Sequence, residues 1–279
     1  MACCSLEIFA PRSAAGVEEL LRGRLPEFAK RGPRFVGVSG AASSGTLRLA
    51  AELRNSFAIA AQLHLPRAGA SEAELGAAID AAMRVGVRDV LLLGGAPGTL
   101  HSAGGGDFAS AAAAVKFVKA KYGELLRVAV CGFPRGTSGE AGDYLADLKE
   151  LQKQVEAGAE TVICLPVFET RAFTDFVADV AKMSLRCVVL PGLLPIREPA
   201  EFQRICRSLH LTPPAWLLAR LADAAAAPSC GDALFVSLVR ELKAAGHSWP
   251  HVYTLNAAST LSLLDAAGYT PLAHRAATR

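Results

Sequence analysis

Eight short apolar segments, each followed by a turn and a longer segment with helical periodicity, constrain the fold of this chain most strongly. Strands that alternate with helices in this way form a parallel sheet. Eight such units in 279 residues match the number and length expected of a (β/α)8 barrel, so we predict an α/β fold of this type. The predicted strands are 4–9, 34–39, 58–65, 89–95, 127–133, 161–167, 186–192 and 251–256.

An open, doubly wound sheet is the competing arrangement. Such a sheet usually has fewer strands, and when it binds dinucleotides it carries Gly-x-Gly-x-x-Gly after the first strand. That motif does not follow the first strand here.

The segment 197–250 is longer than one crossover requires and predicts additional helices between the last two strands. Ser71 and Glu74 have the spacing of a capping box, which predicts the start of a helix. We expect residues 1–279 to form a single barrel domain.

Composition and charge exclude several classes of protein. With 52% hydrophobic and 20% charged residues, the chain is globular, and its net charge of +3, with no basic cluster, argues against a nucleic-acid partner. No apolar run approaches the roughly 20 residues of a membrane span. The seven cysteines are scattered without a Cys-x-x-Cys pair, which predicts an intracellular, reducing compartment and neither a disulfide framework nor a zinc site.

The carboxyl ends of the predicted strands carry few groups that can titrate. Catalytic residues of such barrels lie at these ends, and only Glu7 and His64 there are titratable. Glu7 is either a site acid with a raised pKa or a carboxylate paired inside the barrel. No further His, Cys or Asp at the strand ends completes a metal-binding set, and no Ser-His-Asp set can be assembled, so we expect no metal.

Eight segments, in the same order, are similar to motifs of one enzyme family. They are SLEIFAPR (5–12), LHL (63–65), VLLLGGAPG (90–98), DFAS (107–110), VCGFPRG (130–136), the run 147–169, LPGLLPI (190–196) and HVYTLN (251–256). On these motifs the chain resembles the methylenetetrahydrofolate reductase family. The resemblance implies a (β/α)8 enzyme in which FAD takes a hydride from a nicotinamide and passes it to methylene-folate. It also implies that Glu7 is the general acid, that His64 and Asp147 contact the flavin, and that Ser39 replaces a threonine.

The chain departs from the family pattern at six positions where the resemblance implies site residues. The family's arginine, aspartate, tyrosine, histidine, lysine and glutamine are replaced here by Gly94, Ala96, Phe133, Thr137, Gln154 and Leu165, respectively. Each polar contact to a charged, buried ligand is worth about 1.5–3 kcal/mol. The loss of four would remove roughly 6–12 kcal/mol, or about four to nine powers of ten in affinity.

Two hypotheses follow from these substitutions. In the first, the chain is a pseudoenzyme without FAD or folate turnover, a structural or accessory subunit of a larger hetero-assembly. Degenerate metabolic enzymes recur in mitochondrial complexes, so this hypothesis includes a respiratory-chain assembly on the matrix side. In the alternative, the chain is a divergent FAD-dependent methylenetetrahydrofolate reductase that uses Glu7, Ser39, His64 and Asp147. We expect no bound cofactor under the first hypothesis and FAD under the second.

Overall fold

Eight parallel strands close into a barrel with each strand paired to its neighbours in chain order. The computed structural model describes residues 4–40, 42–66, 69–94, 106–135, 141–209, 211–222 and 227–269. The strands are β1 Ser5–Phe9, β2 Phe35–Ser39, β3 Ala60–Pro66, β4 Asp89–Leu93, β5 Arg127–Gly132, β6 Thr161–Pro166, β7 Val188–Leu193 and β8 His251–Tyr253. The prediction of a (β/α)8 barrel is therefore confirmed, and each predicted strand overlaps an observed one.

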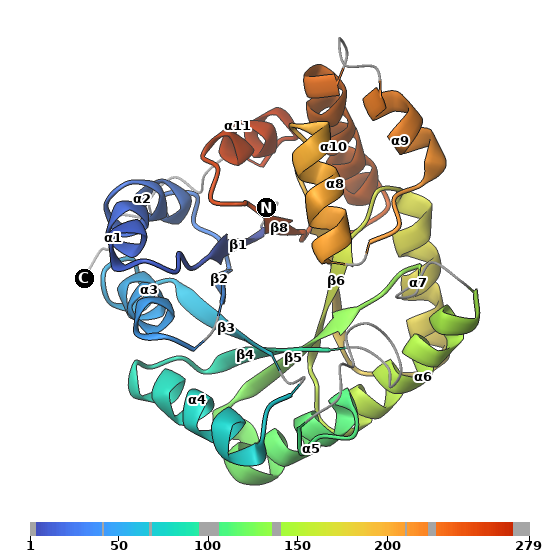
Figure 1. Cartoon of the computed structure of the whole chain (residues 1–279). Helices are drawn as coiled ribbons and strands as arrows, with labels where there is room; N and C mark the ends of the chain where they lie inside the picture. The colour runs from blue at the N-terminus through green and yellow to red at the C-terminus, as the bar shows by residue number, and fades with distance from the viewer. Residues whose placement is uncertain are drawn as a thin grey trace.

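Helices surround the strands, and Figure 1 shows α8, α9 and α10 gathered on one side of this outer layer. These three helices lie in sequence between β7 and β8, as the length of the segment 197–250 predicts. The helices are α1 Ala14–Arg22, α2 Arg24–Ala29, α3 Ser44–Asn55, α4 Glu72–Arg84, α5 Ala111–Tyr122, α6 Ala141–Glu156, α7 Thr170–Lys182, α8 Pro199–Ser208, α9 Ala215–Ala222, α10 Ala227–Ala244 and α11 Ser259–Ala266, with a 3-10 turn at Gly123–Leu125. The capping box at Ser71 and Glu74 begins α4 as expected.

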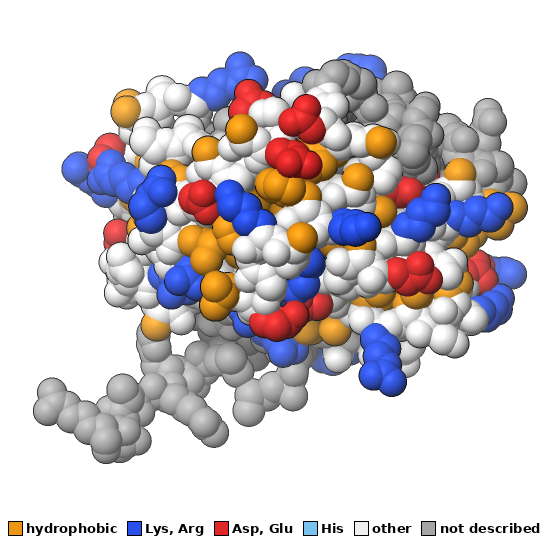
Figure 2. Space-filling view, turned by 90° about the horizontal axis from the view of Figure 1, so that it is seen from below, with side chains coloured by type: hydrophobic (Ala, Val, Ile, Leu, Met, Phe, Trp, Pro, Cys, Tyr) orange, Lys and Arg blue, Asp and Glu red, His pale blue; other side chains and the backbone are white. Residues whose placement is uncertain are grey.

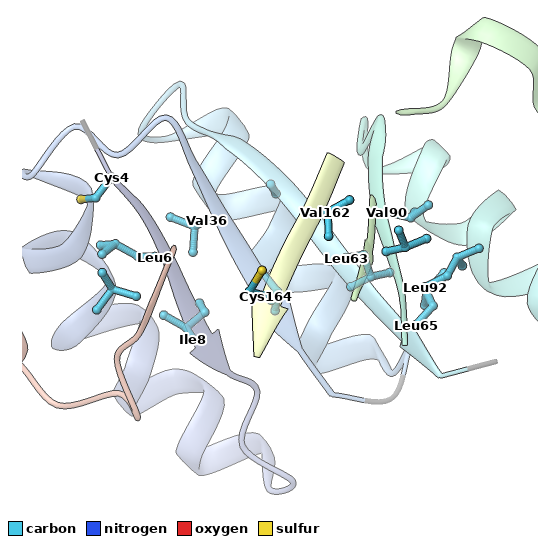
Figure 3. Packing of buried hydrophobic residues seen from close by; sticks show 14 of the residues in the cluster. Cys4, Leu6, Ile8, Val36, Leu63, Leu65, Val90, Leu92, Val162 and Cys164 are labelled. Atoms are coloured by element: carbon cyan, nitrogen blue, oxygen red, sulfur yellow. The ribbon is translucent and has the colours of Figure 1, made fainter. Parts of the chain in front are cut away.

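The main hydrophobic core lies between the strands and the helices. Alternate residues of each strand point outward into it, among them Leu6 and Ile8 of β1 and Val36 and Val38 of β2, all fully buried. Figure 3 shows Leu6 and Ile8 on the same side of β1. The other residues of each strand therefore face the inside of the barrel, where the candidate site is found.

β8 is only three residues long, and side chains beyond it complete the closure against β1. Thr254 Oγ1 donates to the carbonyl of Glu7 at 2.6 Å. Asn256 pairs with both backbone groups of Phe9: its Nδ2 donates to the carbonyl at 2.7 Å, and its Oδ1 accepts from the amide at 2.9 Å. The motif HVYTLN thus joins the two ends of the barrel sheet.

The surface charges and the helices can be compared with two expectations from the sequence, a small net charge and no membrane-spanning segment. On the face drawn in Figure 2, Lys and Arg side chains are interspersed with Asp and Glu, in keeping with the small net charge. Within the described ranges, none of the helices combines the length and the apolar character needed to cross a membrane.

Candidate functional site inside the barrel

Three titratable side chains from three strands meet inside the barrel: Glu7 of β1, His64 of β3 and His251 of β8. One carboxylate oxygen and one nitrogen of each imidazole all lie within 4.8 Å of one another. The strand register brings them together, because Ser5 pairs with His251 and Ser39 of β2 pairs with His64. All three are buried, with exposed fractions of 3% for Glu7, 1% for His64 and 0% for His251.

The Glu7 carboxylate is the centre of this cluster. Its Oε2 lies 3.1 Å from Nε2 of His251 and 3.6 Å from Nδ1 of His64. Nδ1 of His251 lies 2.9 Å from the hydroxyl of Ser5, and Nδ1 of His64 lies 3.0 Å from the hydroxyl of Ser39. The partners of His251 fit one tautomer, in which Ser5 donates to Nδ1 and Nε2–H donates to Glu7.

Gly37 of β2 leaves room for the imidazole ring of His64. It pairs with Glu7 on one side, and a Cβ at this position would lie 2.5 Å from Nε2 of His64. That nitrogen is buried and has no hydrogen-bond partner among the described residues. The observed position of the His64 ring therefore requires that residue 37 has no side chain.

Burial and hydrogen bonding act in opposite directions on the pKa of Glu7. Burial alone would raise the pKa of Glu7, but attraction to His64 in its protonated form and hydrogen bonds from His251 and Ser39 outweigh it and lower the pKa below its ordinary value. Burial lowers the pKa of His64 to about 4, so this imidazole is neutral at pH 7. Of the two roles considered for Glu7, the geometry favours a carboxylate paired inside the barrel and does not support a raised pKa in the free protein.

The cluster contains two imidazoles and a carboxylate, a set that is chemically able to ligate a divalent cation. The strand-end positions of the sequence do not predict this set, because His251 is the first residue of β8 and lies away from the carboxyl ends of the strands. In the structure, however, Oε2 of Glu7 and both nitrogens of His251 already have hydrogen-bond partners. We therefore describe the group as a hydrogen-bonded cluster.

The inside of the barrel is divided into a polar and an apolar half. The polar half is formed by β1, β2, β3 and β8 and contains the cluster. The apolar half comes from β4 to β7, and its buried residues are Leu91, Ala129, Cys131, Phe133, Ile163 and Leu190, with Leu165 packed against them. Two of the predicted departures, Phe133 and Leu165, therefore lie in this apolar half.

The other sequence-predicted residues lie apart from the cluster in the fold or outside the described residues. Asp147 and Gln154 are both buried on α6 of the helix layer, and Oε1 of Gln154 has no hydrogen-bond partner within the part of the chain described. Gly94 follows β4 and is buried. Ala96 and Thr137 lie outside the described residues.

Sequence reasoning missed His251 and Ser5. Alternation within β1 places Ser5 on the same face as Glu7 and was available as a clue. The position of His251 along the barrel axis, relative to Glu7, depends on the register between β8 and β1, which local patterns do not encode.

Comparison with known proteins identifies what the chain is similar to. The family model described as methylenetetrahydrofolate reductase matches residues 1–268. A methylenetetrahydrofolate reductase (NADH) of Zea mays is 28% identical over 272 residues, covering 90% of this chain and 46% of its own. A 5,10-methylenetetrahydrofolate reductase of Pectobacterium carotovorum is 25% identical and covers 91% of this chain and 86% of its own.

The chain thus spans about half the length of the plant relative. Among solved structures, an uncharacterized protein from Clostridium thermocellum, described as binding two copies of 5-methyl-5,6,7,8-tetrahydrofolic acid, superposes with a TM-score of 0.68. It covers 95% of this chain and 93% of its own at 12% identity, which supports the fold alone.

Proposed function

Because the chain belongs to the methylenetetrahydrofolate reductase family, we propose that it is an oxidoreductase that reduces methylenetetrahydrofolate, with Glu7 as the acid. The observation that carries the proposal is the buried cluster of Glu7, His64 and His251, which holds the carboxyl predicted for that role. In this proposal the polar half of the barrel is the place of the chemistry, and residues 1–279 are one catalytic domain.

The prediction of a pseudoenzyme is wrong. It was based on the substitutions at the predicted site, and it included loss of FAD and a role in a respiratory assembly. The family match extends over residues 1–268, and the relatives reported above are named as reductases, so the alternative hypothesis is favoured. The sum of four lost contacts treated them as independent, whereas contributions of neighbouring groups in one site are not additive.

Members of this family usually use FAD, and several buried groups suit such a ligand. Oε1 of Gln154 is an acceptor without a partner in the described ranges, on a residue that is only 2% exposed. A ligand hydroxyl or amide would satisfy this acceptor, and an unsatisfied buried acceptor costs about 1–3 kcal/mol. We propose that Gln154 and Asp147 of α6, with Ser39 and His64 of the barrel, hold the cofactor. When bound, FAD would pass a hydride from a nicotinamide to the folate.

Glu7 must acquire a proton before it can donate one. Because its pKa is lowered from the ordinary value, the carboxyl of Glu7 is ionised at pH 7 in the free protein. His251 presents an N–H at 3.1 Å from Oε2, and Ser5 supports the opposite nitrogen, so the carboxylate is fixed in position. The proposed role of His251 is to orient Glu7, whereas the proton itself is delivered from Glu7.

The proposal is tested by loading the purified chain with FAD and following NADH oxidation with and without methylenetetrahydrofolate. We expect stoichiometric flavin binding and folate-dependent turnover. Gln154→Leu should weaken flavin binding by about tenfold or more, because one hydrogen bond to a buried group is worth roughly 1–3 kcal/mol. Gln152→Leu, at a half-buried position on the same helix whose side chain bonds to Glu156, is the control and should leave flavin affinity unchanged. Failure to bind added FAD, together with absence of NADH-dependent folate reduction, would overturn the proposal.

A further inference from the structure

A cavity lies at the opposite end of the barrel from the carboxyl ends of the strands. Its volume is about 270 Å³, and it is lined by the first residues of five consecutive strands, β2 to β6. Gln62 of β3, Arg34 before β2 and Trp249 before β8 also contribute to its wall. The polar and aromatic residues that matter for its chemistry are Arg34, Phe35, Gln62, Asp89, Arg127 and Trp249.

Two lining residues carry buried polar atoms without partners. These atoms are Oε1 of Gln62, a residue only 5% exposed, and Nε1 of Trp249, and neither has a hydrogen-bond partner in the ranges described. An indole N–H can only donate, whereas a carboxamide can turn to donate or accept. A ligand with acceptor oxygens would therefore satisfy the indole N–H, and it would satisfy Gln62 when the carboxamide is turned so that its NH2 group faces the ligand.

The charges at the cavity favour an anion. Arg127 is neutralised by Asp89 through two hydrogen bonds of 2.5 and 2.7 Å. Arg34 has no carboxylate partner among the described residues, and its guanidinium carbon lies 3.6 Å from the ring centre of Trp249. The lining side chains thus leave one uncompensated positive charge beside the free indole N–H.

The walls favour a flat and small ligand. The rings of Phe35 and Trp249 meet edge to face at 6.3 Å, and Val128 and Ala129 add apolar surface. A volume of about 270 Å³ lies just below the usual range of pockets for drug-sized molecules, roughly 300–1,000 Å³. We propose that this cavity binds a small aromatic monocarboxylate, its ring against Phe35 and Trp249 and its carboxylate toward Arg34, Gln62 and the indole N–H.

This second site is distinct from the catalytic cluster. The ring of Phe35 stacks on His251 with centres 5.7 Å apart, so it separates the cavity from the imidazole that holds Glu7. The inference therefore does not depend on the proposed reaction, and its test uses no turnover measurement.

Trp249 provides a direct reporter, because the chain has only two tryptophans and the other, Trp216, lies on α9. In a Trp216→Phe protein we would titrate benzoate, benzamide and benzylammonium, following Trp249 fluorescence and binding heat. We expect saturable binding of benzoate with a Kd of about 1 mM or below. Benzamide should bind at least tenfold more weakly, and benzylammonium should not bind measurably.

Arg34→Gln should weaken benzoate at least tenfold and abolish the preference over benzamide, whereas Arg34→Lys should keep most of that preference. Arg22→Gln, an exposed arginine of α1 whose side chain is 84% exposed, is the matched control and should bind like the parent. If Arg34→Gln is poorly folded, Gln62→Glu serves instead, since a second carboxylate in the cavity should abolish benzoate binding. Equal affinity for benzoate and benzamide, or unchanged benzoate affinity in both Arg34→Gln and Gln62→Glu, would overturn the inference.

Discussion

His64 is a buried imidazole whose protonation links the cluster to the stability of the fold. Its pKa in the folded chain is about 4, against an ordinary value of 6.5. Because the folded pKa is depressed, the contribution to stability is fully present above about pH 6.5 and is lost as the pH falls toward 4. Between these values the unfolded chain binds a proton that the folded chain does not.

We therefore expect wild type to lose about 2 kcal/mol more stability than His64→Gln between pH 7 and pH 5, from the difference between the two pKa values. Urea denaturation at pH 7, 6 and 5 measures this difference. Groups that titrate alike in the two proteins cancel in this comparison. Parallel stability curves for the two proteins would contradict the assignment of a neutral, buried His64.

Gly37 is expected to be required for the position of His64. Gly37→Ala should destabilise the protein by about 1–3 kcal/mol, because the new Cβ would lie 2.5 Å from Nε2 and force the ring to move. Gly76→Ala is the matched control: it lies within α4, and its nearest contact is the flexible end of Lys121, so helix propensity should offset any cost. In a double-mutant cycle with His64→Gln, the two effects should not add, and full additivity would disprove the contact.

At the scale of elements, the closure of the barrel depends on the segment that follows its shortest strand. Asn256 has a φ of +58°, a conformation that asparagine tolerates better than most residues, and it holds Phe9 through two hydrogen bonds. Asn256→Ala should cost about 2–3 kcal/mol, since it loses both bonds and places alanine in the left-handed region.

Asn256→Gly separates these two causes. Glycine avoids the backbone penalty but does not restore the hydrogen bonds. We therefore expect Asn256→Gly to lose about 1–2 kcal/mol of stability, which places it between wild type and Asn256→Ala. Thermal and urea unfolding of the three proteins would measure the differences. Equal stability of wild type and Asn256→Ala would show that β8 closes the barrel without this side chain.

The sequence predicted the elements well because their periodicities are local. Apolar runs with turns and helical segments repeated eight times identify the strands, and the length of the segment 197–250 indicates the extra helices. The cluster was only partly predictable: Glu7, Ser39 and His64 follow from their positions in strands. His251 reaches Glu7 through a register between β1 and β8, and the clearance at Gly37 depends on how His64 packs, so neither can be read from a local pattern.

At the scale of the whole molecule, the barrel combines a polar half that carries the cluster with an apolar half that carries Phe133 and Leu165. The interpretation of these apolar residues as evidence of an inactive protein treated each substitution as an independent loss. Contributions of neighbouring groups within one site are not additive. Which of the six substituted positions alter ligand binding stays a prediction, as does a reducing intracellular compartment.

The central claim is that Glu7 supplies the proton for folate reduction, and rapid-mixing kinetics of the two half-reactions test it most directly. Reduction of the bound flavin by NADH and its reoxidation by methylenetetrahydrofolate would be measured in wild type and Glu7→Gln between pH 6 and 8. We predict that Glu7→Gln leaves the NADH step within about twofold and slows the folate step by about 10²–10⁴-fold, as loss of a general acid does.

In wild type the folate step should become faster as the pH falls, by up to about tenfold per unit, because the lowered pKa keeps Glu7 ionised in this range and only its protonated form can donate. Glu7→Gln should lack this pH dependence. A folate step that keeps its wild-type rate and pH profile in Glu7→Gln would contradict the account.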